Sequence, residues 1–241
     1  MSPERRQILG WGAAAAVAAA LPSGFRLIEL AQARSPQEAA SVLTRWGLLI
    51  DITKCADCDV CVKACHEENG VTSHGRPNTD AQWIRKVSLR DKRTGYAQTL
   101  PLMCQHCEHP PCVDVCPTGA SFKRSDGIVL VDKHTCIGCR YCVMACPYGA
   151  RSFIHEALSD QKADVPRGKG TVESCTLCVH RVDRGEIPAC VEACNRDGGK
   201  AMVFGDLNDK KGELHHRLES EASSQIRPDL ALNTGVRYQG L

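Results

Sequence analysis

Sixteen cysteines are the residues of this sequence whose type and spacing could do chemistry. They form four groups of four, and each group opens with C-x2-C and closes with C-x3-C. Disulfide frameworks have no reason to repeat one local spacing four times, so the pattern favours metal binding. In chain order the quartets are Cys55, Cys58, Cys61, Cys65; Cys104, Cys107, Cys112, Cys116; Cys136, Cys139, Cys142, Cys146; and Cys175, Cys178, Cys190, Cys194.

The third quartet reads CIGCRYCVMACP, which is the C-x2-C-x2-C-x3-C-P run of a bacterial [4Fe–4S] site. In such a run the first three cysteines hold one cluster and the fourth serves the other cluster of a pair. The last spacing places Cys146 about one helical turn beyond Cys142, and Pro147 then ends the helix. We therefore expect Cys146 to bind a neighbouring cluster. The other quartets are variants: the first has His66 in place of the proline, and the second and fourth have insertions before their third cysteine.

The separation of the quartets along the chain suggests which of them exchange their fourth cysteine. Nineteen residues separate the second and third quartets, enough for a hairpin between Phe122 and Val131, and the first and fourth quartets then pair. This predicts four [4Fe–4S] clusters, held at sites that we number 1 to 4. The ligand sets are Cys55, Cys58, Cys61, Cys194 (site 1); Cys175, Cys178, Cys190, Cys65 (site 2); Cys104, Cys107, Cys112, Cys146 (site 3); and Cys136, Cys139, Cys142, Cys116 (site 4).

Two other uses of sixteen cysteines remain as alternatives. Four all-cysteine zinc sites would also use every thiolate, although structural zinc cysteines usually come as two separated C-x2-C pairs. A disulfide scaffold is the second alternative, because the chain carries an export signal. A structural zinc protein is therefore the non-redox reading of the sequence.

The fold class predicted is α+β, a duplicated bacterial-type ferredoxin-like fold with four cluster loops, short strands and short helices. Strands are expected around the cluster loops at 48–52, 127–132, 151–155 and 201–204. We expect one unit from residues 46–103 with 156–206, which holds the first and fourth quartets, and a second from 104–155. Residues 156–174 are polar and predict a surface excursion. Residues 207–241 predict an irregular tail that wraps the body, with a short helix near 213–218.

The N-terminus, residues 1–33, has the pattern of a signal peptide. A basic start with Arg5 and Arg6 precedes an Ala-rich apolar stretch, and Ala31-Gln32-Ala33 supplies a cleavage signal. The paired arginines indicate the twin-arginine route, although Glu4 and Ile8 depart from its usual pattern; a retained membrane anchor is the alternative. That route carries folded proteins, so clusters could be inserted before export. We expect a periplasmic protein that associates with the membrane through its partners.

The motifs of common catalytic sites are missing from this sequence: there is no G-x-S-x-G, phosphate-binding glycine loop or H-E-x-x-H. The net charge of +2, without a Lys/Arg stripe, gives no indication of nucleic-acid binding. A chain of clusters can pass electrons one at a time, so electron transfer without substrate chemistry is the first hypothesis. A reductase that uses an exposed cluster and a metal-bound scaffold are the rivals.

Basic and histidine side chains beside the ligand loops could modify the clusters. Positive charge and hydrogen bonds to sulfur raise cluster potentials. The histidines are better suited to hydrogen bonds or partner contacts than to iron, because cysteine fills every site. The basic residues are Lys54, Lys63, Lys123, Arg124, Arg140, Arg151 and Arg181; the histidines are His66, His106, His109 and His180.

The segments CQHCEHPPCVDVCPTGA and CIGCRYCVMACPYGAR resemble the four-cluster ferredoxin-like subunits of bacterial membrane-bound oxidoreductases, and the likeness covers residues 46–206. Those subunits accompany molybdopterin enzymes of the dimethyl sulfoxide, polysulfide, tetrathionate and formate type, or a quinone-interacting membrane subunit. The resemblance implies the same quartet pairing.

A finer likeness rests on WGLLIDITKCADCDVCVKACHEEN and ACNRDGGKAMVFGDLND. These look like the periplasmic iron–sulfur subunit of the Dsr transmembrane complex, which is linked to dissimilatory sulfite reductase and sulfur metabolism. That likeness implies a quinone-interacting integral membrane subunit and a periplasmic multihaem cytochrome c as partners. Exported subunits of nitrite- and tetrathionate-reducing systems are the alternatives.

Overall fold

The structure is a computed structural model that describes residues 40–55, 58–76, 78–159 and 161–241. The predicted signal peptide, residues 1–33, lies outside the described residues. Within the described part of the chain, no helix is both long and apolar enough to cross a membrane. Residues 40–241 form one compact unit.

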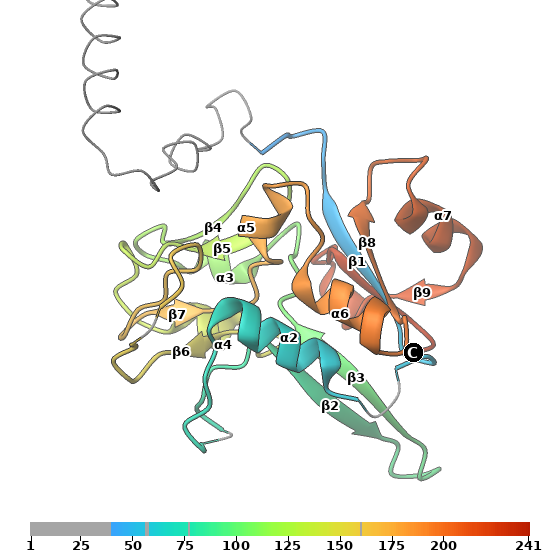
Figure 1. Ribbon diagram of the computed structural model, residues 1–241, viewed down its shortest axis with the longest axis horizontal. Helices are drawn as coiled ribbons and strands as arrows, with labels where there is room; N and C mark the ends of the chain where they lie inside the picture. Colours follow the sequence, from blue (N-terminus) through green and yellow to red (C-terminus); the bar gives the residue numbers. More distant parts are fainter. Residues whose placement is uncertain (1–39, 56–57, 77, 160) are drawn as a thin grey trace, which may run out of the picture. The chain divides into compact units, whose positions relative to one another are not determined.

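Two helices that carry cysteines of the first and fourth quartets pack against each other. Helix α2 (Val60–Asn69) holds Cys61 and Cys65, and α6 (Ala189–Asp197) holds Cys190 and Cys194. These two helices lie side by side although more than a hundred residues separate them in the chain (Figure 1). Tertiary packing therefore brings the last cysteines of quartets one and four to one place.

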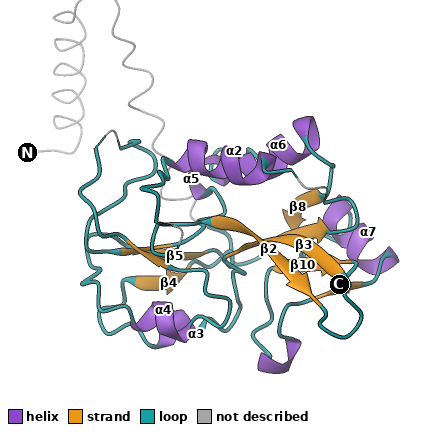
Figure 2. Ribbon diagram, turned by 90° about the horizontal axis from the view of Figure 1, so that it is seen from below, coloured by secondary structure: helices purple, strands orange, loops and turns teal. Residues whose placement is uncertain are grey.

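The second and third quartets have an equivalent but shorter helix pair. Helix α3 (Pro111–Asp114) holds Cys112, α4 (Tyr141–Ala145) holds Cys142, and the two helices are in contact. Figure 2 shows α3 and α4 on one side of the molecule and α2 and α6 on the opposite side, with strands between them.

The residue after each fourth cysteine explains the difference in helix length. Cys146, the residue before Pro147, is extended (φ −76°, ψ 110°), so α4 ends at Ala145. A proline disfavours helical backbone in the residue before it and cannot continue the helix. His66 and Asn195 take the proline's place in the other two helices, which continue to Asn69 and Asp197.

A four-stranded sheet lies beside the long helix pair, with strand order β8-β1-β10-β9. Strand β1 (Trp46–Asp51) runs antiparallel to β8 (Met202–Asp206) and parallel to β10 (Val236–Gln239). Leu48 and Tyr238 are among the side chains that this sheet buries. The predicted strands at 48–52 and 201–204 are confirmed.

The C-terminal tail is more regular than predicted. Helix α7 (Glu213–Ser220) confirms the short helix, but β9 (Ser223–Ser224) and β10 make the tail part of the sheet. A short 3-10 helix, Pro228–Leu230, lies between these strands. The prediction of an irregular tail is therefore wrong for β10, because Val236 and Tyr238 alternate into the core and hydrogen-bond to β1.

Short hairpins surround the cluster loops. Strands β4 (Ser121–Lys123) and β5 (Val129–Val131) pair antiparallel and form the predicted hairpin. Strand β6 (Ser152–Phe153), which the sequence predicts, pairs with β7 (Val172–Glu173), which it does not. The prediction of a surface excursion over 156–174 is wrong at its end, where Val172 and Glu173 are buried.

Gly138 explains why the excursion returns at this point. Gly138 has φ +69°, and a Cβ there would lie 2.2 Å from the carbonyl oxygen of Gly170. Only glycine lets the third cysteine loop approach the 165–172 segment so closely. The segment therefore covers a ligand loop.

The hairpin of β2 (Ile84–Arg90) and β3 (Ala97–Met103) is an element that the sequence analysis missed. Its apolar alternation is weak, and Pro101 lies within β3. Asp91 to Gly95 between the strands is a turn signal that could have revealed it.

Cysteine sulfur forms a large part of the core. Ten of the sixteen cysteines are buried, and nine of these belong to one continuous cluster of buried residues with Trp83, Tyr148 and Tyr238. Aromatic residues are only 5% of the chain, which leaves the thiols as a main filling of the interior.

Candidate metal centre

The thiols predicted for site 1 lie close enough to influence one another's ionisation. Burial raises the pKa of Cys61 to about 12, and the neighbouring thiols Cys55, Cys194 and Cys58 raise it further. Cys194 comes from α6, whereas the other three follow β1. The structure therefore brings a cysteine of the fourth quartet to the loop of the first.

The exchange is reciprocal at site 2. Burial raises the pKa of Cys65 well above its ordinary value, and Cys175, Cys190 and Cys178 add to the rise. Cys65 lies on α2, so the packing of α2 on α6 accounts for both exchanges. All of these thiols are buried.

Sites 3 and 4 show the same arrangement across the short helices. Burial raises the pKa of Cys104 and of Cys107 to about 12, with Cys112 and Cys146 contributing to both. The pKa of Cys142 is raised first by burial and then by Cys136 and Cys116. Cys146 thus lies near the first three cysteines of the second quartet, and Cys116 lies near Cys142 of the third.

Each fourth cysteine also accepts a hydrogen bond at sulfur. Backbone N–H groups of Ser121, Ala150 and Ala201 donate to the Sγ atoms of Cys116, Cys146 and Cys194 at 3.3, 3.4 and 3.4 Å. At Cys65 the donor is a side chain: Asn69 Nδ2 lies 3.7 Å from its sulfur and 3.9 Å from that of Cys178. Such bonds favour a thiolate over a thiol.

The first cysteine of two quartets has a similar donor. Leu177 N–H donates to Cys175 Sγ at 3.3 Å, and Val172 N–H to Cys136 Sγ at 3.5 Å. Hydrogen bonds to ligand sulfur orient the ligands and tune the metal. The backbone is therefore arranged to support thiolates at several of the predicted positions.

The donor set fits iron–sulfur clusters. Metal binding requires thiolates, while burial and mutual repulsion hold many of these thiols protonated in the bare protein. The positive charge of iron would reverse that balance, and all sixteen cysteines are free to serve as ligands. Among the described residues, no group of three or more His, Cys, Asp or Glu side chains is found that could hold a single metal ion.

Three further interactions connect the predicted sites in a row. Cys61 of site 1 raises the pKa of Cys190 of site 2. Cys104 of site 3 raises the pKa of Cys175 of site 2. Cys142 of site 4 raises the pKa of Cys112 of site 3. The thiols at the two ends of this row are more exposed than those of site 2. Every thiol of site 2 is buried, whereas site 1 includes two half-buried thiols and site 4 includes the exposed Cys139.

Most of the basic side chains beside the ligand loops are engaged by acids, carbonyls or rings. Arg124 bonds both Asp126 and Asp183. Arg181 contacts Glu68, Glu186 and Glu192. Lys54 pairs with Asp51, Lys123 donates to the carbonyl of Glu108, and Arg140 lies 3.7 Å above the ring of Phe153. Arg151 differs, because it is 4% exposed and its three buried nitrogens have no carboxylate or carbonyl partner among the described residues; it interacts instead with the sulfurs of Cys112 and Cys142.

Three of the four histidines beside the ligand loops are buried or half-buried, and the fourth, His109, is exposed. Burial, followed by the charge of Arg151, lowers the pKa of His106 to about 3, and its Nδ1 accepts the N–H of Val129 at 3.1 Å. His180 Nε2 lies 2.8 Å from Glu68. Burial lowers the pKa of His66.

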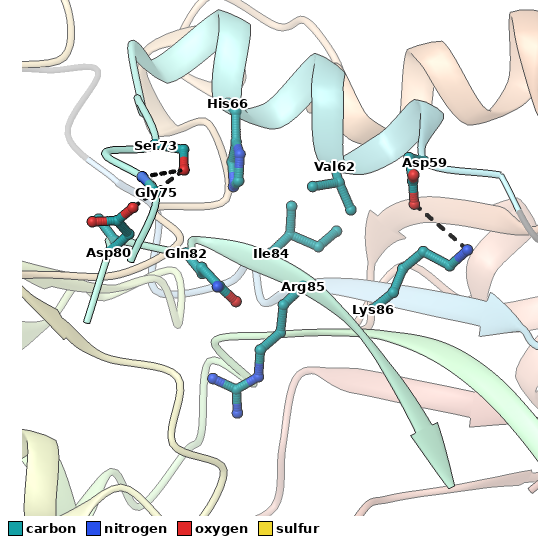
Figure 3. A pocket seen from close by; sticks show the side chains of 11 residues that line it. Asp59, Val62, His66, Ser73, Gly75, Asp80, Gln82, Ile84, Arg85 and Lys86 are labelled. Carbon is teal, nitrogen blue, oxygen red and sulfur yellow. Dashed lines mark hydrogen bonds and ion pairs between the residues drawn. The ribbon is translucent and has the colours of Figure 1, made fainter. Parts of the chain in front are cut away.

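A cavity of about 420 Å³ lies between α2 and β2, beside the first quartet (Figure 3). Charged groups that line it are engaged within the protein. Asp59 Oδ1 lies 3.5 Å from Lys86 Nζ, Asp80 accepts backbone N–H groups of the 74–76 segment, and Arg85 donates to the carbonyl of Gly149. These groups therefore have structural roles.

Comparison with known proteins agrees with this chemistry. Residues 95–207 and residues 54–120 each match a family described as a 4Fe-4S dicluster domain. The chain is 41% identical to iron–sulfur subunit 1 of the Hdr-like menaquinol oxidoreductase of Archaeoglobus fulgidus, over 100% of this chain and 99% of that protein.

Two other relatives match most of the chain. One tetrathionate reductase subunit of Salmonella typhimurium is 36% identical over 92% of this chain and 84% of its own length. Protein NrfC of Escherichia coli is 36% identical over 79% of this chain and 77% of its own length. Such subunits carry electrons and leave substrate chemistry to other subunits. The chain accordingly belongs to the family of iron–sulfur electron-transfer subunits of membrane-associated oxidoreductases, built on 4Fe-4S dicluster domains.

Proposed function

We propose that this protein carries electrons one at a time through four [4Fe–4S] clusters, held at sites 1 to 4 as defined above. The observation that carries the proposal is the exchange of fourth cysteines. Cys194 lies with the first quartet, Cys65 with the fourth, Cys146 with the second and Cys116 with the third. Each bound cluster supplies a one-electron redox centre, and the protein's residues hold, bury and tune it.

The order of the sites follows from the thiols that interact across them. We propose that sites 1, 2, 3 and 4 lie in a row, because a ligand thiol of each site raises the pKa of a ligand thiol in a neighbouring site. Sites 2 and 3 are the more buried, so they suit internal transfer. Sites 1 and 4 include more exposed ligands and suit exchange with partner subunits.

The partners that we propose are a quinone-interacting integral membrane subunit at one end and a second redox subunit at the other, with a periplasmic multihaem cytochrome c as the candidate. The relative from a menaquinol oxidoreductase, which matches along the whole chain, supports a quinol-linked complex. The N-terminal twin-arginine pattern supports export to the periplasm, with membrane association through the partners.

A role in sulfur metabolism, as the iron–sulfur subunit of a Dsr-type complex, is the specific assignment that we propose. The motifs at the first and fourth quartets support it. An electron-transfer subunit of a tetrathionate- or polysulfide-type molybdopterin reductase, or of a nitrite-reduction system, is the alternative, and the tetrathionate reductase and NrfC relatives favour keeping it.

Anaerobic purification with metal analysis tests the cluster count. We expect about sixteen iron and sixteen sulfide per chain, because four clusters each contain four of both. Stepwise reduction should give four paramagnetic centres, and the isolated protein should not turn over sulfur or nitrogen oxyanions. A colourless protein that contains zinc would contradict the proposal.

Copurification tests the assignment to a complex. Isolation from membranes with identification of the attached subunits should recover a quinone-interacting subunit and a multihaem cytochrome. Recovery of a molybdopterin subunit instead would favour the alternative and leave the four-cluster proposal intact.

A further inference from the structure

Arg151 is a buried cation in the part of the molecule where the second and third quartets meet. It directly precedes β6 and follows the fourth cysteine of the third quartet by five residues. The residue is only 4% exposed, and its buried Nε, Nη1 and Nη2 have no carboxylate or carbonyl partner among the described residues; the side chain interacts instead with the sulfurs of Cys112 and Cys142. A buried charge is costly unless other charges compensate for it.

Carboxylates do not provide that compensation. The ion pairs found among the described residues do not include Arg151, although they include Arg124 and Arg181. The groups that favour its charged form are instead cysteine sulfurs, those of Cys112, Cys104 and Cys142, and burial opposes them.

These sulfurs belong to two different sites. Cys104 and Cys112 are ligands of site 3 in our assignment, and Cys107 of that site also responds to Arg151. Cys142 is a ligand of site 4 and comes from α4, which packs on α3. The guanidinium therefore lies where two neighbouring clusters would both feel its charge.

The consequence for a redox protein is electrostatic. Reduction adds a negative charge to a cluster, and a nearby positive charge stabilises the reduced form. Interactions between charges are stronger in a buried site than at the surface, where water and salt screen them. Arginine also keeps its proton throughout the physiological pH range, so its charge is permanent.

We propose that Arg151 tunes electron transfer: its fixed charge raises the reduction potentials of the clusters at sites 3 and 4 together. The inference rests on the proposed four-cluster function. Site 3 feels the larger effect, because three of its ligands interact with Arg151 and only one of site 4 does. We expect smaller shifts at sites 1 and 2, whose ligands lie on the α2 and α6 side of the molecule.

The test is redox titration of purified, cluster-loaded protein, followed by electron paramagnetic resonance. Arg151→Met removes the charge and keeps most of the volume. We expect the equilibrium constant for reduction to fall at least tenfold at two of the four centres, a shift of about 59 mV for a one-electron couple. Arg151→Lys, which keeps the charge, should recover most of the lost potential.

Arg140→Met is the matched control. Arg140 is an exposed arginine next to Cys139 of site 4, and it stacks on Phe153. The variant removes the same charge from the same neighbourhood, but solvent screens that charge. We expect a change of less than about threefold in the reduction equilibrium. Equal shifts in Arg140→Met and Arg151→Met would overturn the inference, as would unchanged potentials in a fully loaded Arg151→Met protein.

A second measurement keeps the inference testable if Arg151→Met does not assemble. Wild-type protein is labelled with ¹⁵N in its arginine side chains, and the reduced clusters are examined for hyperfine coupling to ¹⁵N. Coupling at two centres supports the inference, and its absence at all centres refutes it. Iron content far below sixteen per chain in wild-type protein would instead refute the proposed function, so the two failures are distinguishable.

Discussion

Replacement of Arg167 by methionine should destabilise the protein strongly. Arg167 Nε donates to Oε1 and Oε2 of Glu173 at 3.1 and 3.0 Å, and the side chains are 5% and 0% exposed. Arg167 also donates to the carbonyl of Gly70, the residue that caps α2. One side chain thus connects the loop before β7 both to β7 and to the helix that carries Cys65.

The magnitude follows from the charge that the substitution leaves behind. Arg167→Met strands the Glu173 carboxylate in a dry interior, and the loss of one partner of a buried ion pair costs about 3–5 kcal/mol. For a chain of this size, 1 kcal/mol corresponds to about 2–4 °C, so we expect Tm to fall by about 6–20 °C. The assay is thermal unfolding of the cluster-loaded protein, followed anaerobically by circular dichroism at a fixed scan rate.

Two controls isolate the buried pair. Arg184→Met breaks the ion pair with Asp164, whose side chains are 51% and 63% exposed, and should cost at most about 1 kcal/mol. Replacement of both Arg167 and Glu173 by apolar residues should be less harmful than Arg167→Met alone, because the buried carboxylate is then removed together with its main partner. An Arg167→Met protein with the same Tm as Arg184→Met would refute the reasoning.

Three further predictions concern the ligands and one loop. Cys104→Ser and Cys146→Ser should each alter the same paramagnetic centre, and the double variant should alter no second one. Cys136→Ser combined with Cys146→Ser should instead alter two centres. The opposite pattern would show that Cys146 binds the cluster of its own quartet. Asn69→Ala removes the hydrogen-bond donor to the sulfur of Cys65. It should speed the loss of the cluster to a chelator, because loss of such partners weakens metal binding by about 10–100-fold. An unchanged rate of loss at equal iron content would contradict this prediction. Hydrogen bonds from the backbone N–H groups of Arg76 and His74 hold the pKa of Asp80 at about 2, below its unfolded value of about 3.9. The ionised carboxylate therefore stabilises the folded state fully above about pH 4, and this contribution is lost as the pH falls through 2. Asp80→Asn should therefore make the 72–80 loop more sensitive to pepsin at pH 4.5, and equal cleavage of both proteins would refute the role of the carboxylate.

The sequence alone determined the features that depend on neighbouring residues. The spacing within each quartet predicts the cluster chemistry, and Pro147 predicts the end of the helix before it. The hairpin of β4 and β5 follows from a short separation along the chain. In these cases backbone geometry over a few residues fixes the outcome, whatever the rest of the protein does.

Only the tertiary structure decided the features that depend on distant segments. The sequence places Arg151 among seven comparable basic residues, and its burial distinguishes it from the others. Residues 236–239 do not show which strand they join, and their pairing with β1 makes the tail part of the core. The packing of α2 on α6 joins quartets far apart in the chain. The physical reason is that apolar burial and charge compensation are properties of the assembled interior, and local spacing does not encode which distant side chains will meet there.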